Sequence, residues 1–251
     1  MSGTDSAGVS WEGRSFDHVE SSDDDGSAPE RLIEALRRFR SRELGEAEVV
    51  AAVRESRLLI PLVAVLGESG HNEHGLVVDK SQELSIVTVE GPDGRNVLPV
   101  FTSVAAMTAW NPKARPVPAV GPRVALAAAS EGTDLVVIDP TSATEFAIRR
   151  PALWAMAKAD PWKPSYLDED VLAEFILAAE PEHAVVAVQL APGDPDARLA
   201  APELVVHLSL VDGLDEAAIA SLMARLQERW TSSALIAERV DSMAVRLASA
   251  S

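Results

Sequence analysis

The chain has 251 residues, a net charge of −17 at pH 7 and no cysteine. Its length suits one large or two small domains, and its core must be built from Ala, Val, Leu and Ile because only 4% of the residues are aromatic. The negative charge disfavours nucleic acids and anionic membranes as partners, since both bind clustered Lys and Arg. The lack of cysteine excludes disulfides, thiol nucleophiles and Cys-ligated metals.

Residues 1–28 are predicted to be a disordered acidic tail. They contain seven acidic residues and one basic residue, and they are rich in Ser, Gly and Asp, a composition that cannot bury enough apolar surface to offset chain entropy. Trp11 and Phe16 are interpreted as isolated aromatic residues in preference to a docking motif. The tail lacks the features of a signal peptide, and no apolar run approaches the ~20 residues of a membrane span. We therefore expect a cytoplasmic protein.

Order is expected to begin at Ser27, where the first helix is predicted. Ser27 and Glu30 have the spacing of a capping box, and Pro29 suits the first turn of a helix. Apolar residues then recur at helical spacing up to Phe39. A second short helix is predicted at 46–56.

The next predicted elements are strands. A continuous apolar run at 58–66 predicts a strand, and Pro61 is expected at an edge or a bulge because proline cannot donate a ladder hydrogen bond. Strands at 83–91 and 95–102 are predicted to form a hairpin around the turn residues of 91–94.

The second strand of this hairpin turns directly into a predicted helix. Thr102 and Ser103 both suit the N-cap position, where a side-chain oxygen accepts a backbone N–H from the first turn. The helix is predicted to close at Trp110, because the Asn-Pro pair that follows disfavours further helix. We interpret this segment as a packing joint between a sheet and a helix.

Residues 160–165 are the best candidate for a domain boundary, since they contain two prolines and precede a sharp rise in acidity. The predicted fold class is α+β (α/β), with two small mixed-sheet domains whose helices pack on the sheets. The predicted units are the tail (1–28), an N-terminal α/β domain (29–160) and a C-terminal α+β domain (161–251). The other predicted elements are a Pro-rich connection (114–122), a helix (123–132), a strand pair (134–140 and 144–150), helices (151–159 and 168–179), strands (184–190 and 204–210), a helix (215–230) and a strand (about 235–247).

Motifs that indicate catalysis or metal binding are weak, and no catalytic residue, metal site or cofactor is predicted. His71 and His74 lie in a polar segment that looks like a loop, with too few convergent ligands for zinc. His183 and His207 stand alone at strand positions and are interpreted as structural. The acidic residues at 168–170 suit the start of a helix. Neither a G-x-S-x-G motif nor a phosphate-binding glycine motif is present, although a triad from distant segments stays open.

Two sets of residues are singled out. The first is a candidate binding surface near the end of the strand that precedes the joint, because ligands of open α/β sheets favour the carboxyl ends of strands; it comprises Arg95, Thr102, Ser103 and Arg115. The second is a set of structural aromatic residues expected in the core, namely Phe101, Trp110 and Trp154.

The sequence also resembles the N-terminal domain of the bacterial SseB family over residues 29–159. The most specific part of the resemblance is "LPVFTS" with the closing Trp110, and the other segments are "LLIPLVAV", "LVVIDP" and "RRPALWAMA". The C-terminal region is similar to the second domain of longer SseB-type proteins, and the Ala-, Arg- and Asp-rich composition is similar to that of actinobacterial proteins. The resemblance implies a two-domain α/β protein and transfers no catalytic residue. Sulfurtransferases that share the name need a cysteine persulfide, which a chain without cysteine excludes.

Three functions remain open from the sequence. The leading hypothesis is a non-catalytic cytoplasmic interaction or regulatory module with a protein partner. The alternatives are a protein that binds a small, amino-acid-like ligand and a hydrolase with a non-local triad. Assembly into homo-oligomers is left open.

Overall fold

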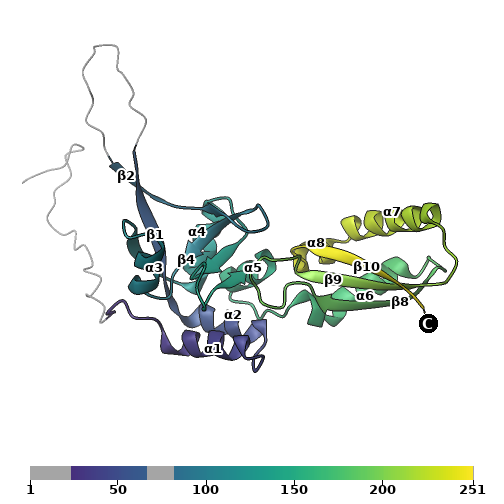
Figure 1. The fold of residues 1–251 in the computed structure, drawn as a ribbon, viewed down its shortest axis with the longest axis horizontal. Coiled ribbons are helices and arrows are strands. Elements are labelled where there is room, and N and C mark those ends of the chain that lie inside the picture. Colours follow the sequence, from purple (N-terminus) through teal and green to yellow (C-terminus); the bar gives the residue numbers. More distant parts are fainter. Residues whose placement is uncertain (1–23, 67–81, 251) are drawn as a thin grey trace, which may run out of the picture.

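The computed structural model describes residues 24–66 and 82–250. The predictions for Trp11, Phe16, His71 and His74 lie outside these residues. Figure 1 shows two bodies joined end to end, which we call the N-terminal lobe (24–158) and the C-terminal lobe (165–250). The division into domains at residue 160 stays a prediction.

The described residues of the N-terminal lobe form two small sheets and five helices. Its elements are α1 (Glu30–Arg40), α2 (Glu46–Glu55), β1 (Arg57–Leu66), β2 (Gln82–Ile86), β3 (Val89–Glu90), β4 (Asn96–Val100), α3 (Val104–Trp110), β5 (Arg115–Val120), α4 (Gly121–Ser130), β6 (Val136–Ile138), β7 (Phe146–Ile148) and α5 (Arg150–Lys158).

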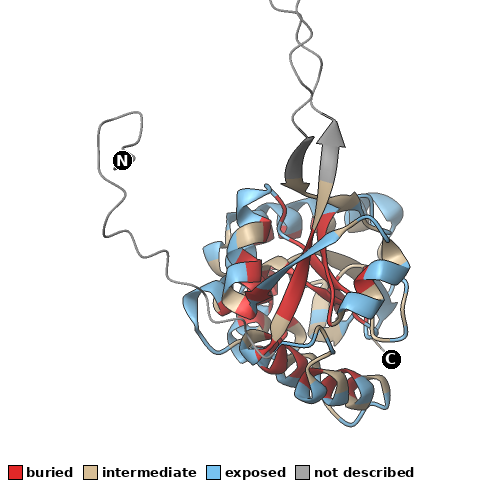
Figure 2. Cartoon of the chain, turned by 90° about the vertical axis from the view of Figure 1, so that its left-hand side faces the viewer, coloured by how far each residue is buried: buried red, intermediate tan, exposed pale blue. Residues whose placement is uncertain are grey.

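One sheet of this lobe has the antiparallel order β2-β1-β5, and the other has the order β3-β4-β6-β7. In the second sheet β4 and β6 are parallel, while β3 and β7 are antiparallel to their neighbours. A two-residue antiparallel bridge between Leu59 and Phe101 joins the sheets. Their strands pack against α1, α2, α4 and α5 around one apolar core, and Figure 2 shows these buried residues on the central strands and the inner helix faces.

The C-terminal lobe has one sheet, with the order β10-β9-β8. Its elements are η1 (Ser165–Leu167), α6 (Glu169–Ala179), β8 (Val185–Pro192), β9 (Leu204–Leu210), α7 (Glu216–Ser232), α8 (Ala234–Arg239) and β10 (Met243–Ser249). Alternate residues of β9 share a second core with Phe175 of α6 and Trp230 of α7, whose rings lie 5.4 Å apart. The predicted α+β class is confirmed, and each lobe has a core of its own.

The connection between β8 and β9 crosses from the C-terminal lobe into the N-terminal lobe. Ala197 and Leu199 are each only 2% exposed and belong to apolar clusters of the N-terminal lobe. The backbone N–H of Ala147 on β7 donates to the carbonyl of Ala197 at 2.7 Å. This contact covers the free edge of β7, which would otherwise present unpaired backbone groups.

The Pro-rich connection predicted at 114–122 is wrong in its central part, which forms the strand β5. Its residues pair with β1, and Pro116 lies directly opposite Pro61. β2 pairs with β1 only from Leu62 onward. β1 is the middle strand of its sheet, but at Pro61 it has β5 on one side and no strand on the other. The two prolines therefore face each other at a position that needs no N–H donor.

The strand predicted at about 235–247 is also wrong in its first half, which forms α8. The hydroxyl of Ser233 accepts a hydrogen bond from the N–H of Ile236 and caps this short helix, and only 243–249 form the strand β10. The apolar pattern of this segment fits both states, because a short run does not distinguish a helix from a strand.

The capping box predicted at Ser27 is absent, and the N-cap of α1 is Pro29, without a side-chain hydrogen bond. The chain makes tertiary contacts before Ser27. Asp24 forms an ion pair with Arg57 at 2.8 Å, and the carbonyl of Gly26 accepts from the N–H of Val104. The described contacts of the body thus begin at Asp24.

Candidate functional site

The structure does not bring the predicted surface residues together. Arg95 precedes β4, whereas Thr102 and Ser103 follow it, so they lie at opposite ends of a strand that spans roughly 16 Å. Arg115 begins β5 and is exposed. The strand predicted at 95–102 itself separates Arg95 from Thr102 and Ser103, so these residues do not form one cluster.

Thr102 and Ser103 both have structural partners. Ser103 is the N-cap of α3 and accepts from the N–H of Ala106 at 3.1 Å. Thr102 is 2% exposed, and its N–H and hydroxyl donate to the carboxylate of Asp139 at 2.8 and 2.7 Å. Thr144 donates to the same carboxylate at 2.8 Å. Asp139, just after β6, thus holds the strand-to-helix joint from the neighbouring strand.

The three aromatic residues expected in the core differ in exposure. Phe101 is 1% exposed, and its ring lies 5.2 Å from that of Trp110, which is half-buried. Trp154 is 40% exposed on α5 and is not a core residue. The guanidinium of Arg150 lies 5.1 Å from the Trp154 ring centre, which is a cation–π geometry.

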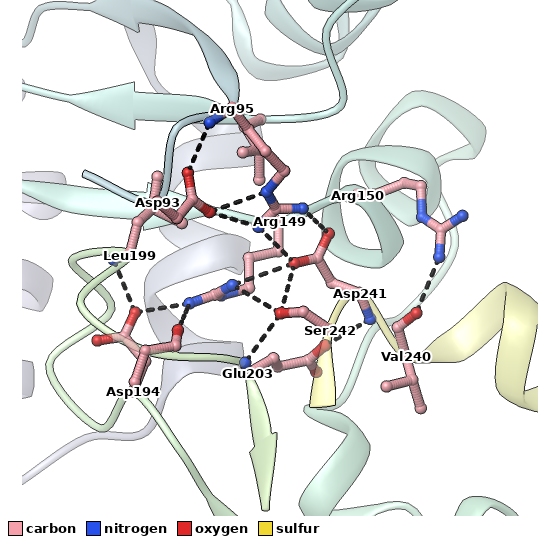
Figure 3. A network of polar contacts seen from close by, with 12 residues as sticks. Asp93, Arg95, Arg149, Arg150, Asp194, Leu199, Glu203, Val240, Asp241 and Ser242 are labelled. Carbon is pink, nitrogen blue, oxygen red and sulfur yellow. Dashed lines mark hydrogen bonds and ion pairs between the residues drawn. The ribbon is translucent and has the colours of Figure 1, made fainter. Parts of the chain in front are cut away.

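A buried network of charges connects the two lobes (Figure 3). Arg149, at the N-cap of α5, contacts Asp194 at 2.7 Å and Asp241 at 3.1 Å. Arg95 makes two hydrogen bonds to the same Asp241 carboxylate, at 3.0 and 2.9 Å. The side chains of Arg149, Asp194 and Asp241 are 7%, 3% and 2% exposed. Such buried charges are tolerated only when they are paired and fully hydrogen-bonded.

Neighbouring groups complete this network. Ser242 accepts from Arg149, and Glu203 accepts from the N–H of Asp241 at 2.7 Å and from the hydroxyl of Ser165 at 2.6 Å. Burial raises the pKa of Asp241, but Arg95 and Arg149 outweigh this effect and the net pKa lies below its ordinary value. Burial raises the pKa of Glu203 above its ordinary value despite the hydrogen bond from Ser165.

Arg150 adds a second link next to the network. It donates to the carbonyls of Ala237 and Val240 at 2.9 and 2.8 Å, where α8 ends. Cations suit the C-terminus of a helix because of the helix dipole. Two consecutive arginines at the start of α5 therefore fix the position of the turn between α8 and β10.

A groove of about 330 Å³ lies beside these links, between α5, the linker and the end of α8. We call it the interlobe groove. One face of α5, which includes Trp154 and Lys158, lines the groove. Trp162 of the linker (159–164) also lines it. Asp168, only 4% exposed, accepts from Lys163 and Arg239 across the groove, both at 2.9 Å. These ion pairs join the linker to α8 and complete the groove wall.

A second hollow of about 200 Å³ adjoins the interlobe groove on the side of α2. Both hollows are lined by the linker residues Asp160, Pro161 and Trp162. Trp162 is half-buried and packs against the core of the N-terminal lobe. The linker thus forms a ridge, which we call the linker ridge (160–162), between two hollows.

The described residues lack two arrangements that are typical of catalytic and metal sites. Among residues 24–66 and 82–250, no hydrogen bond joins a serine to a histidine, and no group of three or more His, Asp or Glu side chains has the arrangement of a metal site. In the same residues, no helix is long and apolar enough to cross a membrane. The chemistry that the arrangement offers is aromatic and polar contact with a ligand in the hollows.

The sequence reasoning missed Arg149, Arg150 and Asp241. A signal was present, because two arginines open α5, where the helix dipole disfavours cations. Basic residues in that position need negative partners from elsewhere in the fold. The partners themselves could not be predicted, since Asp241 lies 92 residues away from Arg149.

The comparisons with known proteins agree with this description of the N-terminal lobe. Residues 32–155 match the family model described as SseB protein N-terminal domain. No curated protein and no solved structure matches the chain. The matched segment begins in α1 and ends in α5, so it includes both sheets of the lobe, the joint at Thr102 and the two arginines that contact the C-terminal lobe. Residues 32–155 of this chain therefore form an N-terminal domain of the SseB family.

Proposed function

We propose that this chain is a non-catalytic cytoplasmic interaction module, in which the interlobe groove is the docking surface for a protein partner. The observation that supports this function is a pair of tryptophans, Trp154 and Trp162, that line one groove. Tryptophan in a groove is typical of the residues that dominate binding energy at protein interfaces. We also propose that the C-terminal lobe is the second domain of an SseB-type protein.

The form of the groove favours a peptide segment over a small molecule. Trp154 is 40% exposed, and Lys158 and Lys163 are also exposed, so a ligand in the groove stays partly open to solvent. Small-molecule sites bury most of their ligand. A segment of a partner protein needs no such enclosure.

A small, amino-acid-like ligand is the second candidate. The groove volume of about 330 Å³ lies at the lower end of the range of small-molecule sites. The lining carries both cationic and anionic side chains, which suits a zwitterion. Saturable binding of a free amino acid in calorimetry, lost in Trp154→Ala, would favour this candidate over a protein partner.

Site-directed photo-crosslinking in the producing cells tests the proposed function. A photo-crosslinking amino acid replaces Lys158 in the groove or, as a control, Leu126, which is 60% exposed on α4 and does not line the groove. We expect a crosslinked protein product from position 158 and not from position 126. The product should disappear when Trp154→Ala is added.

Equal products from both positions, or a product from position 158 that survives Trp154→Ala, would show that the groove is not the docking surface. A circular dichroism melt of the Trp154→Ala protein is the folding control. Because Trp154 is 40% exposed and lies outside the core clusters, its loss should lower the melting temperature only slightly.

A further inference from the structure

We infer that two copies of this chain associate through β10, so that their C-terminal sheets join edge to edge into one continuous sheet. This inference concerns a different surface from the interlobe groove and does not depend on the proposed function. Three observations support it, which are the unprotected edge of β10, the self-complementary register of its free backbone groups and the apolar side chains beside it.

β10 leaves a row of backbone groups without partners. It is an edge strand in the order β10-β9-β8 and pairs with β9 in parallel (Figure 1). The N–H of Leu204 donates to the carbonyl of Ser242, and the N–H of Ala250 donates to the carbonyl of Leu210. These two bonds fix the alternation of the ladder, so the even-numbered residues of β10 bond to β9. The groups that point away from β9 belong to Met243, Val245, Leu247 and Ser249. Among residues 24–66 and 82–250, none of these four N–H groups donates a hydrogen bond.

Other sheet edges of the chain are protected against pairing with a further strand. The N–H of Leu59 donates to Phe101, so Pro118, directly opposite Leu59 on β5, directs its nitrogen to the free edge, where proline cannot donate. The edge of β7 is covered by Ala197, and β8 has an irregular register and ends at Pro192. β10 contains neither a proline nor a register shift, and no described segment pairs with its free side. Such an edge is a template for pairing with another strand.

A second copy matches this edge because the free groups of β10 are complementary to themselves. A two-fold axis through Leu247 aligns two antiparallel β10 strands, with Leu247 opposite its own counterpart and Val245 opposite Ser249. All of these residues direct their N–H and carbonyl groups away from β9. Each opposed pair therefore exchanges two hydrogen bonds, and each copy supplies the partners that the other lacks.

The other possible axes meet obstacles within the same strand. An axis through Arg246 opposes two arginines, and like charges directly opposite each other destabilise a strand pair. An axis through Val245 places Ser249 opposite Asp241, whose N–H already donates to Glu203 at 2.7 Å. The axis through Leu247 avoids both, because it places Arg246 opposite an alanine at position 248.

Apolar side chains beside the edge also favour a second copy. Leu247 is 42% exposed and lies on the core-facing side of the sheet, in register with Leu208. Together with Leu214 and Ile219 it lines a hollow of about 210 Å³ near the start of α7. In the dimer, Leu247 of the second copy packs beside this hollow and removes apolar surface from water. Because Arg246 is the only charged residue of β10 in a chain with a net charge of −17, two acidic molecules meet here with little local repulsion.

The first test measures the mass of the full chain in solution by analytical ultracentrifugation over a range of protein concentrations. We expect an equilibrium between monomer and dimer. Leu247→Pro removes an N–H that points away from β9, so the fold should persist while dimerisation weakens at least tenfold. Circular dichroism is the folding control. Val186→Ala, at a 57% exposed position on β8, is the matched variant and should leave dimerisation unchanged.

The second test uses cysteine crosslinking, which is specific because the chain contains no cysteine. In the inferred register the Cα atoms of the two Leu247 residues lie ~5.5 Å apart, within the range of a disulfide. Leu247→Cys should therefore form a covalent dimer on mild oxidation. A mixture of Val245→Cys and Ser249→Cys proteins should form a mixed dimer, whereas Val245→Cys alone and Val186→Cys alone should not crosslink.

A chain that stays monomeric at every concentration, or a dimer that Leu247→Pro leaves unchanged, would overturn the inference. Crosslinking of Val186→Cys as fast as that of Leu247→Cys would overturn it as well, since random collision would then explain the product. A monomeric chain whose Leu247→Cys protein crosslinks to a different protein in cells would assign the edge to another partner and contradict the second copy. If Leu247→Pro fails to fold, the cysteine variants decide the question by themselves.

Discussion

At the scale of single residues, the half-buried carboxylate of Glu46 next to the lobe contact has an unusual environment. Glu46 of α2 accepts a hydrogen bond from the hydroxyl of Tyr166 at 3.1 Å. Burial raises the pKa of Glu46 to about 7; the Tyr166 hydrogen bond opposes this rise and the nearby charge of Glu203 adds to it. Glu46 thus links the N-terminal lobe to η1 and titrates near neutral pH.

The first prediction concerns the stability cost of ionising Glu46. The folded state holds its proton up to pH 7, whereas the unfolded state releases it near pH 4.5. Between these values the folded state binds more protons, so the contribution of Glu46 to stability falls as pH rises. The upper limit of this fall is ~3 kcal/mol. Glu46→Gln keeps an oxygen acceptor for Tyr166 and should remove the fall.

Urea denaturation at pH 5, 6, 7 and 8 measures this effect. The difference in free energy of unfolding between Glu46→Gln and the unchanged chain should grow toward high pH in favour of the variant. Glu131→Gln, at an exposed position directly after α4, is the control and should show no such trend. A pH-independent difference for Glu46→Gln would show that Glu46 is already ionised at pH 5 in the folded protein.

At the scale of elements, the joint between β4 and α3 depends on the strand next to it. Asp139 accepts three hydrogen bonds, two from Thr102 and one from Thr144, and it is 2% exposed. Its φ of 44° is in the left-handed region, which few residues other than glycine adopt. The short polar side chain of Asp tolerates this conformation through local hydrogen bonds.

The second prediction compares two residues of this joint. Asp139→Ala leaves the N–H and the hydroxyl of Thr102 without their acceptor in a buried site, at a cost of ~1–3 kcal/mol for each unsatisfied group. Ser103→Ala removes one cap, at a cost of about 0.5–2 kcal/mol. Thermal and urea denaturation should therefore rank Asp139→Ala as the more damaging change. The reverse order would mean that the cap, and not Asp139, holds the joint.

The elements also show how far the sequence determines the fold. The cap of α3, predicted at Thr102 or Ser103, the turn at 91–94 and the helix that follows Asp168 depend on neighbouring residues, and the sequence predicted them. The strand predicted at 83–91 is only partly correct, because it divides into β2, which pairs with β1, and β3, which pairs with β4. β5 and α8 were missed because Pro-rich and short apolar segments fit several states, and a distant partner selects one of them. The interlobe groove joins α5, the linker and α8, whose proximity depends on Arg149 and Arg150, so no local pattern predicted it.

At the scale of the whole molecule, the lobes are joined by contacts of several kinds. Arg149 reaches Asp194 and Asp241, and Arg150 reaches the end of α8. The β8–β9 connection buries Ala197 and Leu199 in the N-terminal lobe. Arg42 also bonds to Asp196 at 2.7 Å. These contacts hold α5 and α8 on opposite sides of the interlobe groove, so the groove depends on both lobes.

The third prediction tests this dependence. Arg149→Met preserves most of the side-chain volume but leaves Asp194 without its ion-pair partner and Asp241 with Arg95 alone. Loss of one partner from a buried charge network costs ~3–5 kcal/mol. Arg246→Met, at an exposed site on β10, is the matched control and should cost less than ~0.5 kcal/mol. Urea denaturation measures both, and equal effects would show that the network contributes nothing to stability.

The most direct test of the interlobe groove as the docking surface is hydrogen exchange with mass spectrometry, with and without the protein that crosslinks to position 158. We predict slower exchange in 150–163 and 234–242, which form the two sides of the groove, and unchanged exchange in the β8 and β9 strands. Protection confined to the outer surface of either lobe, away from these two segments, would contradict it.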